Sequence, residues 1–417
     1  MALPRGSTTI AVAAIFGVLL RLAFAFLYWH DKPLTHDERE YLALAESISA
    51  GRGFAYADDH ETGTAQQFGR APAYPVFLAA IGVPAGRHDV APPRVKVAQA
   101  VVGGLGVLVI GLLARRAAGT TAGTAAAVIA AAYPPLVWMC AYVLSETLYS
   151  TVALTAALLL DGAIDRATLS ERPWVRRGAT WAVAAGFATG VAILVRPAML
   201  FFLPLAALWL LRMHRPSLAA TLVAASLIVV TPWTVRNLRV YDRFVLVASE
   251  GGVTFWTGNH PLARGEGDLA ANPQIKAADL EFRKAHPGAS AEALEPLYYR
   301  DAFAHITAHP GWWFALLAKK AFYTIVPAGP SYALHSTLYR VWSVASYMLL
   351  LPLAILGLRA WAGRPHRPEA LFVLAASAIV VCLVFFPQER FRIPVLDPTL
   401  IVCAAIWAGR RFHTTEI

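Results

Sequence analysis

The chain has 417 residues, of which 57% are apolar and only 15% are charged, and its net charge is +10. About a quarter of the residues of an ordinary soluble domain are charged, so this composition argues against a soluble protein. The basic residues are scattered over short loops and form no continuous stripe, which argues against nucleic acid as a partner. They favour anionic lipid headgroups or phosphates instead.

Repeated apolar runs of about 20 residues predict an all-α polytopic membrane protein, because a helix of that length crosses a hydrocarbon core about 30 Å thick. The first run resembles a signal peptide, but it continues to Trp29 without a small-residue cleavage site, so we expect it to remain as a span. The three cysteines stand at no metal-ligand spacing and are interpreted as core residues. The ten runs suited to spans cover residues 8–29, 95–114, 119–141, 145–164, 178–195, 197–212, 217–235, 338–358, 369–387 and 393–409.

Ten spans place both termini on one side of the membrane. The short loops on that side carry basic pairs such as Arg115 with Arg116, so the positive-inside rule assigns it to the cytoplasm. The two long hydrophilic segments, 30–94 and 236–337, then face outward. We divide the chain into an N-terminal transmembrane module with the first outer loop, an outer region with interfacial helices and a set of C-terminal transmembrane helices, which cover residues 1–235, 236–337 and 338–417.

Residues 311–328 are an ambiguous eleventh segment, so the chain has about 10–11 transmembrane helices. Lys319 and Lys320 lie in the middle of the segment, and its aromatic residues suit a headgroup belt. We therefore expect an interfacial helix. An odd number of spans would also move the C-terminal basic clusters outward, against the positive-inside rule.

A charged cluster directly follows the first apolar run. Thr35 and Glu38 have capping-box spacing, so a helix is expected to start at His36 and to end at Gly51, a suitable residue just beyond a helix. Apolar residues repeat along one face of this helix, which predicts an amphipathic helix resting on the membrane surface.

Carboxylates near the membrane are few, and three of them are candidates for chemistry. Asp37 lies in the first turn of the predicted helix, where backbone N–H groups favour the ionised form, and an ionised carboxylate can act as a general base. First-turn acids are also favoured by the helix dipole alone, and the capping box gives Glu38 a structural explanation. Glu146 lies at the outer end of two apolar runs, where a carboxylate is costly unless it has a partner or faces water; a helix start at Ser145 is the alternative.

Several arginines occupy span ends on the predicted outer side. Arg196 stands between two apolar runs and has either Glu146 or a phosphate as its expected partner, although snorkelling to lipid headgroups explains it equally well. Arg236, Arg390 and Arg392 come from different spans and are expected to converge. Guanidinium groups at one depth suit a lipid-linked phosphate, whose oxygens accept paired N–H donors. Arg21 lies deep in the first run and is expected to pair inside the bundle.

Short motifs along nearly the whole chain resemble the GT-C superfamily of membrane glycosyltransferases, in particular the bacterial enzymes similar to protein mannosyltransferases and aminoarabinose transferases. The acidic motif of the first outer loop is the most specific of them. The motifs are His36-Asp37-Glu38-x-x-Tyr41-x-x-x-Ala45, Gly51-x-Gly53-Phe54, Arg70-x-Pro72-x-Tyr74-Pro75, Leu144-Ser145-Glu146, Arg196-Pro197, Pro232-Trp233-x-x-Arg236-Asn237 and Arg390-Phe391-Arg392-x-Pro394.

The resemblance implies an inverting transferase in the bacterial inner membrane. Its donor would be a sugar on a polyprenyl phosphate, and its acceptor a lipid, glycan or protein of the cell envelope at the extracytoplasmic face. It implies that Asp37 is the base, and that cationic residues stabilise the departing phosphate. Glu38 and Glu146 are further catalytic candidates. The phosphate is assigned to Arg196, Arg236, Arg390 and Arg392, and substrate binding to Arg70, Tyr74, Asn237 and Asn259.

Some members of the superfamily use a divalent metal, but no metal-ligand cluster stands out in the sequence, and we predict no cofactor. A lipid or polysaccharide transporter or flippase is the alternative function. It predicts charged residues along the interior of the spans, whereas the charges here concentrate in outer loops and at span boundaries. A non-catalytic scaffold would leave the clustered acids and arginines without a purpose.

Overall fold

The structure is a computed structural model that describes residues 5–55, 69–86, 88–168, 176–267, 269–361 and 369–413. Within these ranges the chain is helical and has no β-strand, apart from one isolated bridge between Pro33 and Val90. The all-α fold class predicted from the sequence is confirmed.

The N-terminal part supplies most of the long helices. The first, α1 (Arg5–Ala23), continues into a π-helical turn, η1 (Phe24–Tyr28), at its aromatic end. The others are α2 (His36–Ser49), α3 (Ala73–Ala80), α4 (Pro93–Ala118), α5 (Thr120–Ala132), α6 (Pro134–Met139), α7 (Glu146–Thr168), α8 (Arg176–Val195), η2 (Pro197–Phe201), α9 (Phe202–Arg212) and α10 (Pro216–Tyr241).

A second group of helices follows α10, and two of them, α12 and α13, are built from more polar sequence. It comprises α11 (Gly251–Asn259), α12 (Pro273–Lys284), α13 (Ala291–Ala308), α14 (Pro310–Ile325) and the short turn η3 (Pro330–Leu334). The chain then returns to the bundle through α15 (Thr337–Trp361), α16 (Glu369–Val384), the single turn α17 (Glu389–Arg392) and α18 (Leu396–His413).

All ten predicted apolar runs are helical. Six segments of the described chain are long and apolar enough to cross a membrane: Thr8–Tyr28, Pro93–Ala132, Glu146–Ala167, Gly178–Val195, Pro216–Tyr241 and Thr337–Trp361. Pro93–Ala132 contains both α4 and α5, and three shorter apolar helices, Pro197–Arg212, Glu369–Val384 and Leu396–Gly409, complete the set. The chain is therefore a multi-pass membrane protein. The predicted total of 10–11 spans requires α4 and α5 to cross separately and the shorter helices to cross as well.

The third predicted run is interrupted where its sequence contains two prolines. Pro134 and Pro135 remove two backbone N–H donors, so α5 ends at Ala132 and the short α6 starts afresh. Arg21 of α1 is 2% exposed and donates hydrogen bonds to the carbonyls of Ala130 and Ala131, at the end of α5. The expected pairing of Arg21 inside the bundle is confirmed, with carbonyl oxygens at a helix C-terminus as its partners.

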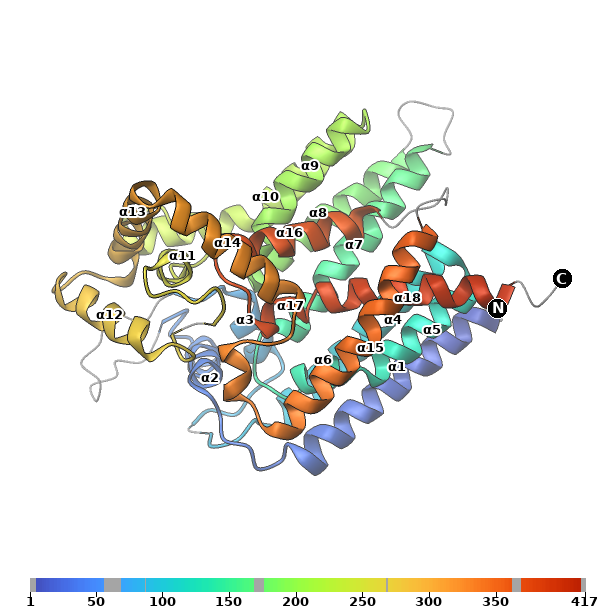
Figure 1. Ribbon diagram of the computed structural model, residues 1–417, viewed down its shortest axis with the longest axis horizontal. Helices are drawn as coiled ribbons and strands as arrows, with labels where there is room; N and C mark the ends of the chain where they lie inside the picture. The colour runs from blue at the N-terminus through green and yellow to red at the C-terminus, as the bar shows by residue number, and fades with distance from the viewer. Residues whose placement is uncertain are drawn as a thin grey trace.

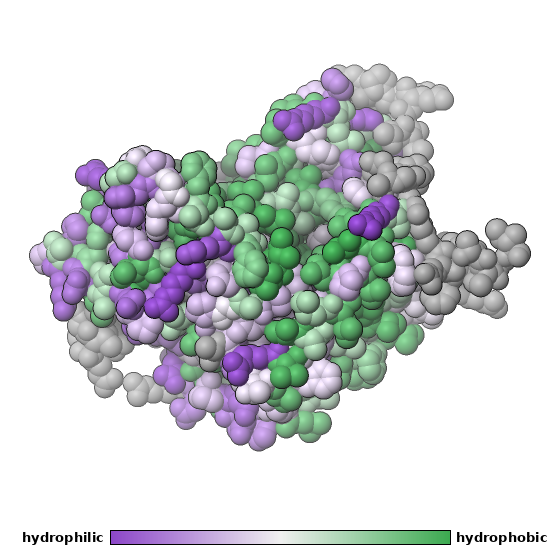
Figure 2. All heavy atoms as spheres, viewed as in Figure 1, coloured by the Kyte–Doolittle hydropathy of each residue, from purple (hydrophilic) through white to green (hydrophobic). Residues whose placement is uncertain are grey.

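The bundle has two distinct ends. Figure 1 shows the start of α1 and the end of α18 at one end, and α2, α3 and α11–α13 at the opposite end. Side chains on the outer face of α1 are apolar, as the exposed fractions of Val12 (59%) and Ile15 (61%) illustrate. In Figure 2 apolar side chains cover much of the bundle, and polar ones gather over α11–α13. This arrangement suits a lipid-facing bundle with a polar lobe at one end.

The C-terminal helix α18 is built into the centre of the bundle. It packs against α4, α5 and α15, and its residues share one hydrophobic core with residues of the N-terminal helices. Gly357 allows the closest approach, because a Cβ atom at this position of α15 would lie only 1.7 Å from the carbonyl oxygen of Cys403 on α18. The segment that follows α16 is thereby held against the N-terminal module, and this fixes the position of α17.

Residues 311–328 largely form α14, which is neither one of the six candidate spans nor one of the three shorter apolar helices. Its buried positions, Leu316, Lys320 and Thr324, follow one another at intervals of four residues and therefore share one face. The opposite face is exposed and apolar, with Phe314 65% and Phe322 54% exposed. A helix with an apolar outer face and a lysine turned inward suits the membrane interface, and the interfacial position stays a prediction.

Candidate active site

Asp37 lies in the first turn of α2, where the predicted capping box fixes the start of the helix. The side chain of Thr35 accepts a hydrogen bond from the Glu38 N–H, and the Glu38 carboxylate accepts one from the Thr35 N–H at 2.7 Å. Gly51, just beyond the last turn, has a φ of +73°, which favours glycine. The predicted limits of this helix are confirmed.

The Asp37 carboxylate is held between two guanidinium groups from distant parts of the chain. Its Oδ1 lies 2.8 Å from Nη2 of Arg70, which stands just before α3, and its Oδ2 lies 2.8 Å from Nη1 of Arg390 on α17. Burial would raise the pKa of Asp37, but Arg70 and Arg390 outweigh burial and hold that pKa well below its usual range. Asp37 is therefore an anion with 25% of its side chain exposed.

Arg70 is the centre of this cluster. Besides Asp37 it pairs with Glu40, also on α2, and with Glu250 at 3.0 Å. Neither Glu40 nor Glu250 was among the candidates from the sequence. The spacing of Glu40, three residues after Asp37, would have placed both on one helix face. Glu250 lies 180 residues from Arg70 and gave no such signal.

Further hydrogen bonds attach the segment around Arg70 to the loop that carries Glu250. The Gly69 N–H donates to Oγ of Ser249 at 2.7 Å, and the Ser249 N–H donates back to the Gly69 carbonyl at 3.0 Å. Oγ of Ser249 also reaches Glu292 on α13 at 3.3 Å. The segment before α3, the loop before α11 and α13 are therefore joined by hydrogen bonds beside the Asp37 cluster.

Glu38 makes contacts that hold α2 in place. Its Oε1 accepts a hydrogen bond from the Val143 N–H at 2.7 Å, and its Oε2 accepts those of Thr35. The residue is 2% exposed, and burial raises its pKa. This geometry ties the start of α2 to the turn before α7. It gives Glu38 a positioning role and leaves its predicted catalytic role as a hypothesis.

Glu146 and Arg196 form an ion pair beside the cluster. Oε1 of Glu146 lies 2.5 Å from Nη1 of Arg196, so of the two partners considered for this arginine the structure has the carboxylate. The Arg196 guanidinium also lies over the ring of Phe391, with 5.1 Å to the centroid. Because Phe391 directly follows Arg390, the Glu146–Arg196 pair packs against α17 next to the arginine that meets Asp37.

The three arginines that were expected to converge do not meet at one point. Arg390 reaches Asp37, whereas Nε of Arg392 lies 3.0 Å from Asp397 on α18, and the Arg392 guanidinium lies 4.0 Å from the Tyr347 ring centroid. Successive residues of a helix are rotated by about 100°, so two residues that are two positions apart in α17 point in nearly opposite directions. Only Arg390 can therefore face Asp37 from this turn.

Arg236 contacts a different segment of the chain, the one around Phe54. Its Nη2 donates to the Phe54 carbonyl at 2.9 Å and its Nη1 to the Tyr241 hydroxyl at 3.0 Å, while the guanidinium lies 4.8 Å from the Trp233 ring centroid. The neighbouring Asn237 donates to the carbonyls of Val245 and Val247. These contacts brace the end of α10.

Two other predicted substrate residues are buried among neighbouring helices. Tyr74 is 0% exposed and packs edge-to-face on Tyr41 at a centroid distance of 4.9 Å. Asn259 is 1% exposed, accepts a hydrogen bond from Nζ of Lys320 at 3.0 Å and donates to the Val384 carbonyl at 2.9 Å. Asn259 thus joins α11, α14 and α16. Tyr74 packs on α2 through Tyr41, and the predicted contact of Tyr74 and Asn259 with substrate remains a hypothesis.

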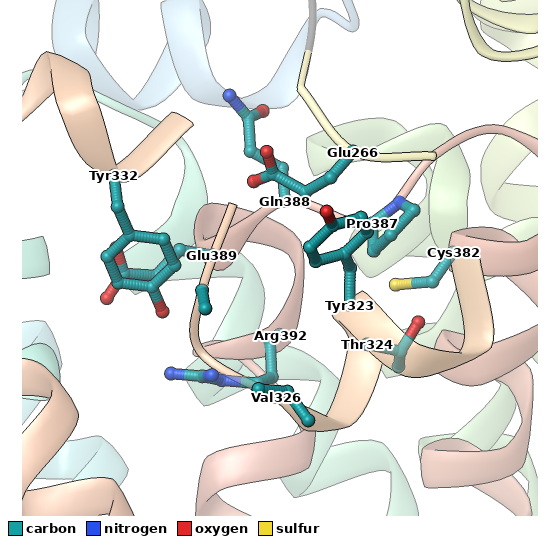
Figure 3. Close-up of a pocket in the computed structure, with 11 residues that line it drawn as sticks. Glu266, Tyr323, Thr324, Val326, Tyr332, Cys382, Pro387, Gln388, Glu389 and Arg392 are labelled. Carbon is teal, nitrogen blue, oxygen red and sulfur yellow. The ribbon is translucent and has the colours of Figure 1, made fainter. Parts of the chain in front are cut away.

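A small cavity lies beside α17, which contributes to its walls (Figure 3). Its walls include Glu266, Tyr332, Gln388, Glu389 and Arg392, and about 10 Å³ is open to a water-sized molecule, room for about one water. Oε1 of Gln388 accepts a hydrogen bond from Nε of Arg390 at 2.8 Å, so one wall of the cavity orients the guanidinium that meets Asp37. Glu389 accepts a hydrogen bond from Ser343, and burial raises its pKa.

The described residues include no group of three or more His, Cys, Asp or Glu side chains that could hold a metal ion. The carboxylates of Asp37, Glu40 and Glu250 are paired with arginine side chains, which do not ligate metals.

No protein-family model matches the chain, and no curated protein matches it by sequence. Solved structures do match its fold. The Archaeoglobus fulgidus oligosaccharyltransferase, tethered with an acceptor peptide containing the NVT sequon, aligns with a TM-score of 0.60 at 14% identity, over 98% of this chain and 50% of that one. The oligosaccharyltransferase AglB of the same organism, in complex with an inhibitory peptide and a dolichol-phosphate, gives 0.59 at 15% identity over 98% and 50%.

ArnT from Cupriavidus metallidurans, bound to undecaprenyl phosphate, aligns at 16% identity over 97% of this chain and 77% of that one, with a TM-score of 0.41. The present chain spans about half the length of the oligosaccharyltransferases that it matches. At these identities the likeness is one of fold. This chain therefore shares the fold of the archaeal oligosaccharyltransferase, and the fold implied by the resemblance to the GT-C superfamily is confirmed.

Proposed function

We propose that this protein is a glycosyltransferase of the bacterial inner membrane. It would move a sugar from a polyprenyl-phosphate donor to a lipid, glycan or protein acceptor at the extracytoplasmic face. The observation that carries the proposal is the meeting of Asp37 with Arg390: a partly exposed carboxylate and a partly exposed guanidinium lie 2.8 Å apart at the polar end of the bundle. Transfer from a lipid phosphate needs a base for the acceptor and a cation for the phosphate, and this pair supplies both.

The fold likeness supports the same proposal. The matched oligosaccharyltransferase structures contain an acceptor peptide in one case, and an inhibitory peptide with dolichol-phosphate in the other. A chain with their fold and a carboxylate–guanidinium cluster at one end of the bundle is suited to similar lipid-linked chemistry.

In the proposed reaction the Asp37 carboxylate takes the proton of an acceptor hydroxyl or amine. The acceptor atom forms a bond to the anomeric carbon of the sugar, and the bond from that carbon to the phosphate oxygen breaks. Polyprenyl phosphate leaves with the electron pair, and Arg390 stabilises its negative charge. A single displacement of this kind inverts the anomeric centre.

Arg196, Arg236 and Arg392 were the other candidates for the donor phosphate. Arg196 and Arg392 are paired with the carboxylates of Glu146 and Asp397, and Arg236 is bonded to loop oxygens. Arg390 is the one of these four arginines that contacts Asp37, the proposed base, so we assign the phosphate first to Arg390. The other three are proposed to hold the segments around the phosphate-binding site in place.

A transporter of lipid-linked sugars is the alternative function. It requires a polar path along the bundle, whereas the charged cluster around Asp37 lies at one end of it (Figure 1). The position of these charges therefore favours a transferase, which reacts at one membrane face, over a transporter.

Release of polyprenyl phosphate tests the proposal, because every sugar and every acceptor yields this product. Purified protein in lipid nanodiscs is incubated with a panel of polyprenyl-phosphate sugars and an envelope extract. We expect Asp37→Asn to lower the release rate about 100-fold or more, as the loss of a general base does. Glu46→Gln, which removes a carboxylate from the same helix, is the control and should keep the wild-type rate. Equal rates for Asp37→Asn and wild type would refute Asp37 as the base.

A further inference from the structure

In this structure Asp37 is poorly prepared to act as a base. Each of its carboxylate oxygens accepts an N–H from a different arginine at 2.8 Å. Burial works in the opposite direction, but the two guanidinium groups hold the pKa of Asp37 well below its usual range. A base works best when its pKa is near the working pH, so one guanidinium has to withdraw before Asp37 can take a proton efficiently.

The two arginines differ in their ability to withdraw. Arg70 lies among three carboxylates, those of Asp37, Glu40 and Glu250, and its side chain is 16% exposed. An arriving phosphate would be repelled by these three negative charges. Arg70 is therefore suited to remain in place and keep Asp37 oriented.

Arg390 is placed to exchange partners. Its side chain is 35% exposed, about twice the exposure of Arg70, and its Nε is held by the neutral Gln388. With Nε held in this way, Nη1 of Arg390 donates to Asp37. Arg390 projects from the single turn α17, and its guanidinium already lies at Asp37, so an anion that arrives beside Asp37 is also beside this guanidinium.

We propose that Arg390 exchanges Asp37 for the phosphate of the lipid-linked donor, while Arg70 stays on Asp37. This inference rests on the proposed function and adds an order of events to it. Donor binding draws the Arg390 guanidinium onto the phosphate and frees one side of the Asp37 carboxylate for the acceptor. Departure of the polyprenyl phosphate after transfer lets the Asp37–Arg390 pair form again.

The exchange makes Asp37 a competitor of the donor phosphate. A model in which Asp37 serves only as a base predicts no effect of Asp37→Asn on phosphate binding. The exchange predicts tighter binding, because the negative charge of Asp37 no longer competes with the phosphate for Arg390. The base-only model and the exchange therefore predict different affinities of Asp37→Asn for the phosphate. This affinity can be measured without any reaction taking place.

The experiment is a double-mutant cycle with polyprenyl phosphate itself, which carries no sugar and cannot turn over. Affinity is measured in nanodiscs with the full chain. We expect Asp37→Asn to bind roughly 3- to 10-fold more tightly than wild type, the size of a partly exposed charge interaction. Arg390→Gln should bind at least about tenfold more weakly. The double variant should bind like Arg390→Gln, because the gain from Asp37→Asn requires Arg390.

Glu46→Gln is the matched control, since it removes one negative charge from α2 at a residue whose ion-pair partner is Arg52. It should leave phosphate affinity unchanged. Unchanged or weaker binding by Asp37→Asn, or tighter binding that persists without Arg390, overturns the exchange. If wild type releases polyprenyl phosphate from donors but Asp37→Asn shows no gain in affinity, the exchange fails and the transferase stands. If wild type neither binds nor releases polyprenyl phosphate, the proposed function fails as well.

Discussion

At the scale of single residues, the position of a side chain on its helix decides whether it faces the substrate or the scaffold. Asp37 and Glu38 are neighbours in the first turn of α2, yet Asp37 is 25% exposed on its side chain and Glu38 is 2% exposed. Asp37 meets arginines, and Glu38 meets backbone N–H groups. One residue is suited to chemistry and the other to holding the helix.

The predicted role of Glu38 is tested by separating stability from turnover. Glu38→Gln weakens three hydrogen bonds at a buried site, so we expect a loss of about 1–3 kcal/mol in the free energy of unfolding. Thr35→Ala removes the cap from the other side and should cost about 1 kcal/mol. Thermal unfolding in detergent measures both. The rate of polyprenyl phosphate release by the folded fraction should change little in either variant, and a Glu38→Gln protein that is stable but inactive would instead make Glu38 catalytic.

At the scale of elements, short helical turns decide which charges meet. The one turn of α17 sends Arg390 to Asp37 and Arg392 to Asp397, so the four residues connect the site to α18. Helices α11 and α13 form a second close contact. A Cβ atom on Gly252 would lie 2.4 Å from the Glu295 carbonyl oxygen, so this contact requires glycine. It also places the Glu295 side chain near the start of α11, beside the loop that carries Glu250.

The contact between α11 and α13 predicts a pH-dependent stability. Burial raises the pKa of Glu295 to about 7, with help from Glu292 and Glu250 and against hydrogen bonds from Gly252 and Gly251. The unfolded value is about 4.3, so the folded state binds this proton more tightly. The resulting stabilisation is complete below about pH 4.3 and is lost as the pH rises through 7.

Glu295→Gln mimics the protonated form and should abolish this dependence. We expect the variant to unfold at a higher temperature than wild type at pH 8 and at nearly the same temperature at pH 4. Glu281→Gln, at an exposed carboxylate on α12, is the control for a change of net charge. A difference between wild type and Glu295→Gln that is the same at both pH values would contradict the raised pKa.

At the scale of the whole molecule, the candidate site lies at the end of the bundle opposite to the start of α1 and the end of α18 (Figure 1). The turn between α9 and α10 carries the exposed His214, and the polar lobe carries the exposed Lys284 on α12. The positive-inside argument places the lobe outside the cytoplasm. The proposed function requires the same orientation.

Labelling of single cysteines tests this orientation. The native residues Cys140, Cys382 and Cys403 are all buried, so they give little background. In intact spheroplasts a membrane-impermeant maleimide should label Lys284→Cys within minutes and His214→Cys only after permeabilisation. The reverse pattern would place Asp37 in the cytoplasm and rule out transfer at the outer face.

The sequence by itself determined the features that depend on neighbours along the chain. The apolar runs specify helices because backbone groups in a membrane must be bonded within their own segment. Thr35 and Glu38 specify the start of α2 because a capping box is a local hydrogen-bond pattern. With the start of that helix fixed, Asp37 could be recognised as the leading candidate for the base.

Only the tertiary structure decided which arginines meet which carboxylates. Arg70, Arg196, Arg236, Arg390 and Arg392 all stand at helix ends or in loops and look alike in the sequence, but each pairing depends on the direction of a side chain and on contacts from remote segments. Glu250 reaches Arg70 across 180 positions, and Arg390 reaches Asp37 across 353. No local rule predicts such pairs, because they form only when α2, α17 and the loop before α11 are packed together.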